Sequence, residues 1–120
     1  MNNEQFEQPK RIRKEIKVIE TPKMKVYLSG AISSDKNHKK KFEHFKDKYI
    51  KKGYEVLSPI ETQAYKTKQS NEKCLFDAIK MMEGIDIMIQ IDNPQKSRGM
   101  QIEQRIADYC NITVIREYTK

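Results

Sequence analysis

Residues 97–103, Ser-Arg-Gly-Met-Gln-Ile-Glu, combine groups that bind an anion with a carboxylate. The segment begins a predicted helix, whose first turn has free backbone N–H groups and the positive end of the helix dipole. Ser97 and Arg98 add a hydroxyl and a guanidinium, which suit a phosphate. Glu103 follows about one turn further along. Spacing alone favours a plain N-cap for Ser97, and it fits Glu103 as well to a solvated helix glutamate as to a functional one.

Four short β-rich runs provide the strands that must position this segment. They are KVYLS (25–29), YEVLS (54–58), IDIMIQI (85–91) and ITVI (112–115). The third run is the strongest, and its alternation predicts one face lined by isoleucines. These are Ile85, Ile87, Ile89 and Ile91.

Apolar residues at helical spacing lie between these runs and predict three helices. The first has Phe42, Phe45, Tyr49 and Ile50 on one face, an N-cap at Ser34 or Asp35 and an end at Gly53. The second carries Leu75, Ala78, Ile79 and Met82 and ends near Gly84. The third carries Ile102, Ile106 and Tyr109. Residues 60–71 are polar and are expected to form a loop, such as a lid.

Alternating strands and helices predict an α/β fold, a flavodoxin-like or Rossmann-like three-layer sandwich with a parallel sheet of four to five strands. For four strands the simplest order is 2-1-3-4. Ligands bind such sheets beyond the carboxyl ends of the strands, at the switch point between strands 1 and 3. The loops 29–35 and 92–100 are therefore expected to lie side by side there.

Length and composition predict one domain, with a polar, basic N-terminal arm at residues 1–23 and the domain at 24–120. The pattern in the arm fits a helix or an edge strand, and a partly ordered arm is expected. No apolar run approaches the length of a membrane helix, and no secretory signal is recognised. With only Cys74 and Cys110 as cysteines, we expect free thiols and a cytoplasmic location.

The order of several motifs resembles the nucleoside 2-deoxyribosyltransferase superfamily over about residues 24–116. The motifs are KVYLSGAIS, GYEVLSPIE, a D-x-x-x-M helix followed by an ID strand, and SRGMQIEQRIA. The pattern is most similar to small bacterial and phage proteins of this superfamily, with 2'-deoxynucleoside 5'-phosphate N-hydrolases as relatives. The resemblance implies cleavage of an N-glycosidic bond in a nucleotide or nucleoside.

The resemblance also implies roles for single residues. Glu103 matches the glutamate nucleophile of the family, which attacks the anomeric carbon. A carboxylate suits this role, because it can stabilise or bond to an oxocarbenium-like sugar. Asp77 matches an aspartate associated with the base or with the proton that it receives. Tyr27 matches a tyrosine near the sugar. Ser97 matches a phosphate-binding serine, and Gly99 matches a glycine that lets the backbone approach the ligand.

The loop after the first strand matches the family loop that wraps the nucleotide, through Gly30, Ala31 and Ile32. Ala31 and Ser33 stand where the hydrolases carry a serine and an arginine for the phosphate. Arg98 is expected to substitute from the other loop. This departure leaves open a second function, a protein that binds or sequesters a nucleotide without cleaving it.

A third hypothesis is a nucleic-acid-binding module built on the lysine-rich helix at residues 36–52. It is not favoured, because Phe42, Phe45 and Tyr49 are expected to face the core rather than stack on bases. No cofactor and no metal site are expected, since His38 and His44 lack partners at ligand spacing. We expect a homodimer or a multiple of one, and three methionines fit either its contact surface or the ordinary core. These are Met81, Met82 and Met88.

Overall fold

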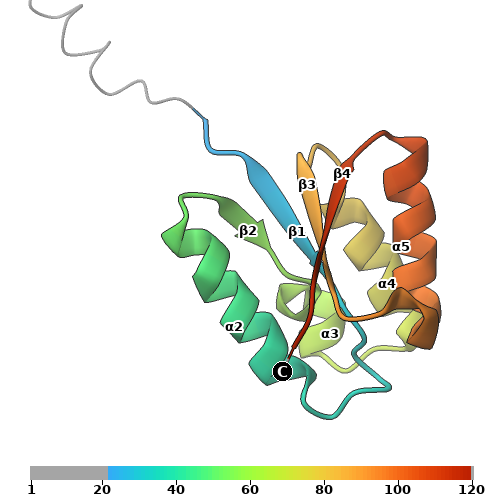
Figure 1. Ribbon diagram of the computed structural model, residues 1–120. Coiled ribbons are helices and arrows are strands. Elements are labelled where there is room, and N and C mark those ends of the chain that lie inside the picture. The colour runs from blue at the N-terminus through green and yellow to red at the C-terminus, as the bar shows by residue number, and fades with distance from the viewer. Residues whose placement is uncertain (1–21, 120) are drawn as a thin grey trace, which may run out of the picture.

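The computed structural model describes residues 22–119, so most of the expected N-terminal arm lies outside the described residues. Helices and strands alternate along this part of the chain (Figure 1). The strands are β1 (Lys25–Ser29), β2 (Glu55–Leu57), β3 (Ile87–Ile91) and β4 (Thr113–Glu117). The α-helices are α2 (His38–Lys51), α3 (Gln63–Lys66), α4 (Asn71–Met81) and α5 (Arg98–Tyr109). Two short 3₁₀ helices are η1 (Pro59–Glu61) and η2 (Pro94–Lys96).

The four strands form one parallel sheet in the order β2-β1-β3-β4. Val26 of β1 is level with Val56 of β2 and with Ile87 of β3. This confirms the predicted fold class and the predicted strand order. The carboxyl ends of β1 and β3 are therefore neighbours, and the loops that follow them leave the same edge of the sheet.

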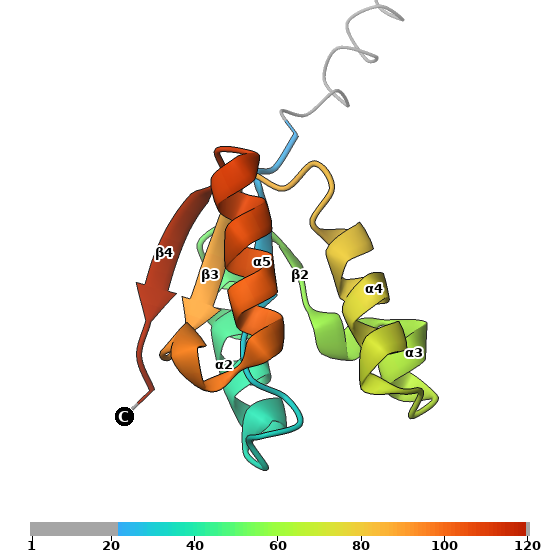
Figure 2. The ribbon, with the colours of Figure 1, turned by 90° about the vertical axis from the view of Figure 1, so that its right-hand side faces the viewer.

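Helices cover both faces of the sheet, which makes three layers (Figure 2). Helix α2 packs on one face through Phe42, Phe45 and Tyr49, which are buried with Val26 and Leu28. Helices α4 and α5 cover the other face, where a second apolar cluster forms. Its buried members are Tyr27, Ala78, Met82, Ile85, Met88 and Ala107.

The alternation of side chains along β1 decides what each face receives. Val26 and Leu28 point to the α2 face, and Tyr27 points to the face of α4 and α5. Ser29 has the same parity as Tyr27 and is fully buried. Two polar groups therefore lie beneath α5 near the carboxyl end of the central strand.

Three details of the predicted apolar faces are wrong, and one of them is on α5, where Ile102 and Tyr109 are exposed and Met100, Glu103 and Ala107 are buried instead. Ile85 precedes β3 and belongs to the cluster under α4 and α5, whereas Ile89 and Ile91 face α2. The turn at Gly84, with φ of +78°, and the non-strand residues after it break the period of two. On α2, Ile50 is exposed, since the adjacent Tyr49 fills the buried position.

Helix α2 begins later than the sequence indicated. Its N-cap is Asn37, not Ser34 or Asp35. The Asp35 carboxylate instead accepts hydrogen bonds from the Asn37 amide and from Lys41 Nζ, which form a turn ahead of the helix. The stretch expected to be a loop at 60–71 contains the end of η1 and all of α3. Thr62 caps α3 by accepting a hydrogen bond from the Tyr65 amide.

Candidate functional site

The Glu103 side chain lies between α5 and the sheet, and only 5% of this residue is exposed. Tyr27 Oη donates to one carboxylate oxygen at 2.5 Å, and Ser29 Oγ donates to the other at 2.7 Å. Both donors are buried residues of β1. Glu103 is therefore not a solvated helix glutamate, and its carboxylate is held from both oxygens near the carboxyl end of the central strand.

Burial raises the pKa of Glu103 from its ordinary 4.5 to about 6. The hydrogen bonds from Tyr27 and Ser29 act in the opposite direction, because they stabilise the ionised form. Burial and the neighbouring Glu103 raise the pKa of Tyr27 well above its usual range, so this phenol stays a donor at neutral pH. A carboxylate in this setting is ionised at neutral pH but only weakly stabilised, which suits a nucleophile or a base.

Gly30 follows β1 at a point where the backbone passes close to α2. A Cβ at this position would lie 3.0 Å from Phe42 Cζ and 3.4 Å from Ile91 Cβ. Packing in the α2 layer therefore favours glycine here, since a Cβ would require Phe42 to shift by a few tenths of an ångström. Next along the loop, Ile32 packs on the same apolar cluster, and Ser33 is exposed.

Lys41 joins the two loops that leave β1 and β3. Its Nζ lies 2.6 Å from a carboxylate oxygen of Asp35 and 3.1 Å from one of Asp92. Asp92 has a backbone φ of +66°, in the left-handed region that residues other than glycine adopt uncommonly. Its carboxylate also accepts hydrogen bonds from the amide and hydroxyl of Thr119. These contacts fix the edge of the sheet at which the predicted site lies.

A second contact connects the β1–α2 turn to α3. His38 Nδ1 lies 2.8 Å from the carbonyl of Asp35, which makes it the donor, and Nε2 lies 2.7 Å from Tyr65 Oη. His38 thus hydrogen-bonds the turn after β1 through one ring nitrogen and Tyr65 of α3 through the other. The segment that the sequence indicated as a lid is therefore attached to the loop after β1.

Asp77 lies on α4 and is half-buried. Its Oδ2 accepts a hydrogen bond of 3.3 Å from the Ala64 amide at the start of α3. Within residues 22–119 no hydrogen bond joins Asp77 to Glu103 or to its two donors. The structure thus places Asp77 between α4 and α3, and its role in proton transfer stays a prediction.

The predicted anion-binding segment begins α5 as expected. Ser97 is the N-cap, and its Oγ accepts a hydrogen bond of 3.3 Å from the Met100 amide, which leaves the hydroxyl proton free for a ligand. Arg98 is exposed. A Cβ on Gly99 would meet nothing closer than 3.9 Å, so packing does not require this glycine.

The family comparison covers most of the chain. Residues 24–116 match the family model described as a domain of unknown function, DUF4406. The chain belongs to the DUF4406 family. No curated protein and no solved structure matches this DUF4406 chain.

Two further observations on this DUF4406 domain concern metal ligands and membrane-spanning helices. Among residues 22–119, no three His, Cys, Asp or Glu side chains are grouped as metal ligands. In the same part of the chain, no helix has both the length and the apolar character needed to span a membrane.

Several residues around the DUF4406 site were not singled out from the sequence. Ser29 could have been found, because it lies two positions after Tyr27 and must share its face of the strand. Lys41, Asp92 and the pair of His38 with Tyr65 give no such signal. The contact of His38 with Tyr65 joins residues 27 positions apart and that of Lys41 with Asp92 joins residues 51 positions apart, which sequence spacing does not reveal.

Proposed function

We propose that this DUF4406 domain cleaves the N-glycosidic bond of a nucleotide or nucleoside, by hydrolysis or by transfer to another base. The observation that carries the proposal is the buried Glu103 carboxylate, held by Tyr27 and Ser29 beside the start of α5. The resemblance to nucleoside 2-deoxyribosyltransferases supports it, since their glutamate nucleophile matches this position.

In this mechanism a Glu103 oxygen attacks the anomeric carbon of the sugar, while the bond from that carbon to the base nitrogen breaks. The electron pair of that bond goes to the base, and an acid protonates it. Water, or a second base, then attacks the same carbon and releases the carboxylate. Tyr27 and Ser29 orient the Glu103 carboxylate and hold its charge until attack.

The 5'-phosphate of a nucleotide fits the beginning of α5. Its oxygens can accept from free backbone N–H groups, from the Ser97 hydroxyl and from the Arg98 guanidinium. Asp77 is the proposed proton donor to the base, with its Oδ2 held by the Ala64 amide and the proton carried on Oδ1.

Nucleotide binding without turnover is the second candidate function. It is favoured by the engagement of both Glu103 oxygens and by the hydrogen bond of Asp77 to the α3 backbone. In the structure both Glu103 oxygens and one oxygen of Asp77 already accept hydrogen bonds from the protein. A protein that sequesters a nucleotide needs no free carboxylate.

The test is to incubate the protein with deoxynucleosides, nucleosides and their 5'-monophosphates, and to measure free base by chromatography. Catalysis predicts base release that falls at least about a hundredfold in Glu103→Gln, the loss of several kcal/mol of transition-state stabilisation. Glu83→Gln, at an exposed position after α4, is the control and should keep full activity. Tight binding of a nucleotide without base release would favour the second function, and full activity of Glu103→Gln would refute the mechanism.

A homodimer is proposed as the assembly, although not through the methionines. Met82 and Met88 are buried in the core, and Met81 packs against it, so of the two alternatives for the methionines the core is the one that holds. Large apolar side chains are instead exposed on α4 and α5. They are Phe76 at 57%, Ile102 at 40% and Tyr109 at 90% exposure.

We propose that these side chains contribute to the contact between two chains. Light scattering at micromolar concentration should give twice the 14.3 kDa of one chain, or a multiple of that. The double variant Phe76→Ser, Ile102→Ser should lower the mass. A wild-type mass equal to one chain would contradict the dimer.

A further inference from the structure

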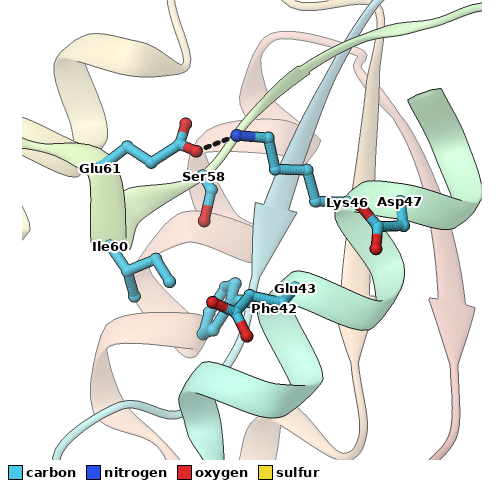
Figure 3. A pocket seen from close by; sticks show the side chains of 7 residues that line it. All are labelled: Phe42, Glu43, Lys46, Asp47, Ser58, Ile60 and Glu61. Atoms are coloured by element: carbon cyan, nitrogen blue, oxygen red, sulfur yellow. Dashed lines mark hydrogen bonds and ion pairs between the residues drawn. The ribbon is translucent and has the colours of Figure 1, made fainter.

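A hollow of about 490 Å³ lies between α2 and the end of β2, away from Glu103. Phe42 lies in it and belongs to the cluster on the α2 face, whereas Tyr27 and Glu103 are on the opposite face. Figure 3 shows side chains from α2 and from the segment after β2 around the same space. The lining residues are Phe42, Glu43, Lys46, Asp47, Ser58, Ile60 and Glu61.

Ser58 contributes an unsatisfied hydroxyl to this hollow. The residue is 1% exposed, and within residues 22–119 its Oγ has no hydrogen-bond partner. Ser58 stands at the N-cap of η1, yet its side chain accepts no hydrogen bond from that turn. Two residues after Val56, it points to the α2 face and, in Figure 3, into the space beside Ile60 and Phe42. A buried hydroxyl without a partner costs free energy that a ligand would recover.

The charged residues that line the hollow indicate the sign of the charge that a ligand would carry. Three carboxylates, on Glu43, Asp47 and Glu61, face a single cation, Lys46, which is already paired with Glu61. Glu43 and Asp47 are four positions apart and therefore share one side of α2. Neither of them forms an ion pair with any other residue of the described range. In a chain with a net charge of +7, this hollow is locally acidic.

We propose that this hollow binds a small organic amine in its protonated form, with a short apolar chain or ring. The ammonium group lies between the carboxylates of Glu43 and Asp47, where charge-assisted hydrogen bonds are strongest. The apolar part packs on Ile60, and on binding the side chains of Phe42 and Ser58, each 1% exposed, shift enough for the ring to contact the ligand and for Ser58 Oγ to accept a hydrogen bond from it. This site is independent of the proposed cleavage at Glu103.

The test uses three probes of similar shape, the 2-phenylethylammonium ion, the neutral 2-phenylethanol and the anionic 3-phenylpropanoate. Each is titrated into the full chain labelled with ¹⁵N, and amide shifts are followed. The ammonium probe should bind at least about tenfold more tightly than the alcohol. Its shifts should centre on α2 and on residues 55–61. Equal binding of the alcohol, tighter binding of the anion, shifts centred elsewhere or no binding of the ammonium probe would each overturn the proposal.

Variants then separate this site from a nonspecific contact. Glu43→Gln with Asp47→Asn changes two exposed positions, so the fold should persist while the ammonium probe binds about tenfold or more weakly. Glu83→Gln, an exposed carboxylate outside the hollow, should bind the probe as the wild type does. Unchanged binding by the double variant would refute the assignment.

Ser58→Ala tests the hydroxyl itself. Removal of an unpaired buried hydroxyl should leave the melting temperature unchanged or raise it. It should also weaken binding of the ammonium probe. A lower melting temperature would show that the hydroxyl has a partner within the protein, which contradicts its role toward a ligand. Glu103→Gln should bind the probe normally, whatever its effect on base release.

Discussion

The Tyr27 hydroxyl and a Glu103 carboxylate oxygen lie 2.5 Å apart, although 76 positions separate the two residues in the sequence. The sheet brings them together, because β1 is central and α5 packs on the face to which Tyr27 points. The Ser29 hydroxyl donates to the other oxygen of Glu103. The two hydroxyls orient this carboxylate and favour its ionised form, and within the described residues it is the one buried carboxylate beneath α5.

Tyr27→Phe should raise the pKa of Glu103 above its wild-type value of about 6, because the lost hydrogen bond stabilises the ionised form. If ionised Glu103 is the nucleophile, the acidic limb of the pH–rate profile should move to higher pH. The wild-type midpoint is expected near pH 6. The control is Tyr109→Phe, at a tyrosine 90% exposed on the same helix as Glu103, which should not move the limb. A limb that stays in place in Tyr27→Phe contradicts the role of this hydrogen bond.

The stability of the wild type should depend on pH through Glu103. Its folded pKa lies above the ordinary value, so the protonated form favours folding. This contribution is complete below pH 4.5 and is lost as the pH rises to about 6. Glu103→Gln does not ionise, so relative to wild type its free energy of unfolding should rise by about 2 kcal/mol over that window. Urea unfolding on both sides of the window measures the change, and a constant difference would contradict it.

Gly99→Ala and Gly30→Ala should have opposite effects on the fold. The methyl group at position 99 meets nothing closer than 3.9 Å, and alanine favours helices, so stability should be kept or should rise by up to about 1 kcal/mol. The same change at position 30 places a carbon 3.0 Å from Phe42 Cζ and should lower the melting temperature. Calorimetry compares the two variants. If a ligand approaches the backbone at Gly99, the stable Gly99→Ala variant should bind the nucleotide more weakly, and unchanged binding would place the ligand elsewhere.

Arg98→Ala should weaken the binding of a 5'-monophosphate and leave the binding of the bare nucleoside unchanged. A hydrogen bond to a charged group contributes about 1.5–3 kcal/mol, and the side chain is exposed, so the fold should not change. Arg105→Ala removes an exposed arginine further along α5 and should bind both ligands as the wild type does. Titration calorimetry with the two ligands provides the measurement. Equal weakening of both by Arg98→Ala would argue against a phosphate at this position.

Lys41→Met should loosen the loops after β1 and β3 together. Without the ammonium group, Asp35 and Asp92 lose a shared partner, and part-exposed ion pairs of this kind contribute at most about 1 kcal/mol. Amide exchange should therefore become faster at residues 30–37 and 92–97 with little change in β1 and β3. Lys39→Met, at an exposed position on the same helix, is the control. Exchange that speeds up in only one of the two loops would show that Lys41 does not couple them.

The sequence by itself determined the sheet and its order. The apolar, β-rich run at residues 25–29, the alternation at 85–91 and the helical spacing of apolar residues between the strands leave few arrangements that bury every apolar face. The same logic placed the loop after β1 and the start of α5 at one edge, and the glycines at 53 and 84, both with positive φ, near the ends of their helices. These features depend on local periodicity and on turn chemistry, which neighbouring residues fix.

The tertiary structure alone decided the partners of the polar groups. Helix α5 turns Met100, Glu103 and Ala107 inward and leaves Ile102 and Tyr109 exposed, so a carboxylate occupies a place that composition would give to an apolar side chain. The hydroxyls of Tyr27 and Ser29 stabilise the buried carboxylate by hydrogen bonding. Burial acts against them, because it disfavours the ionised form of Glu103. Such contacts arise between segments distant in sequence, since hydrogen bonds depend on distances that only the packed layers fix.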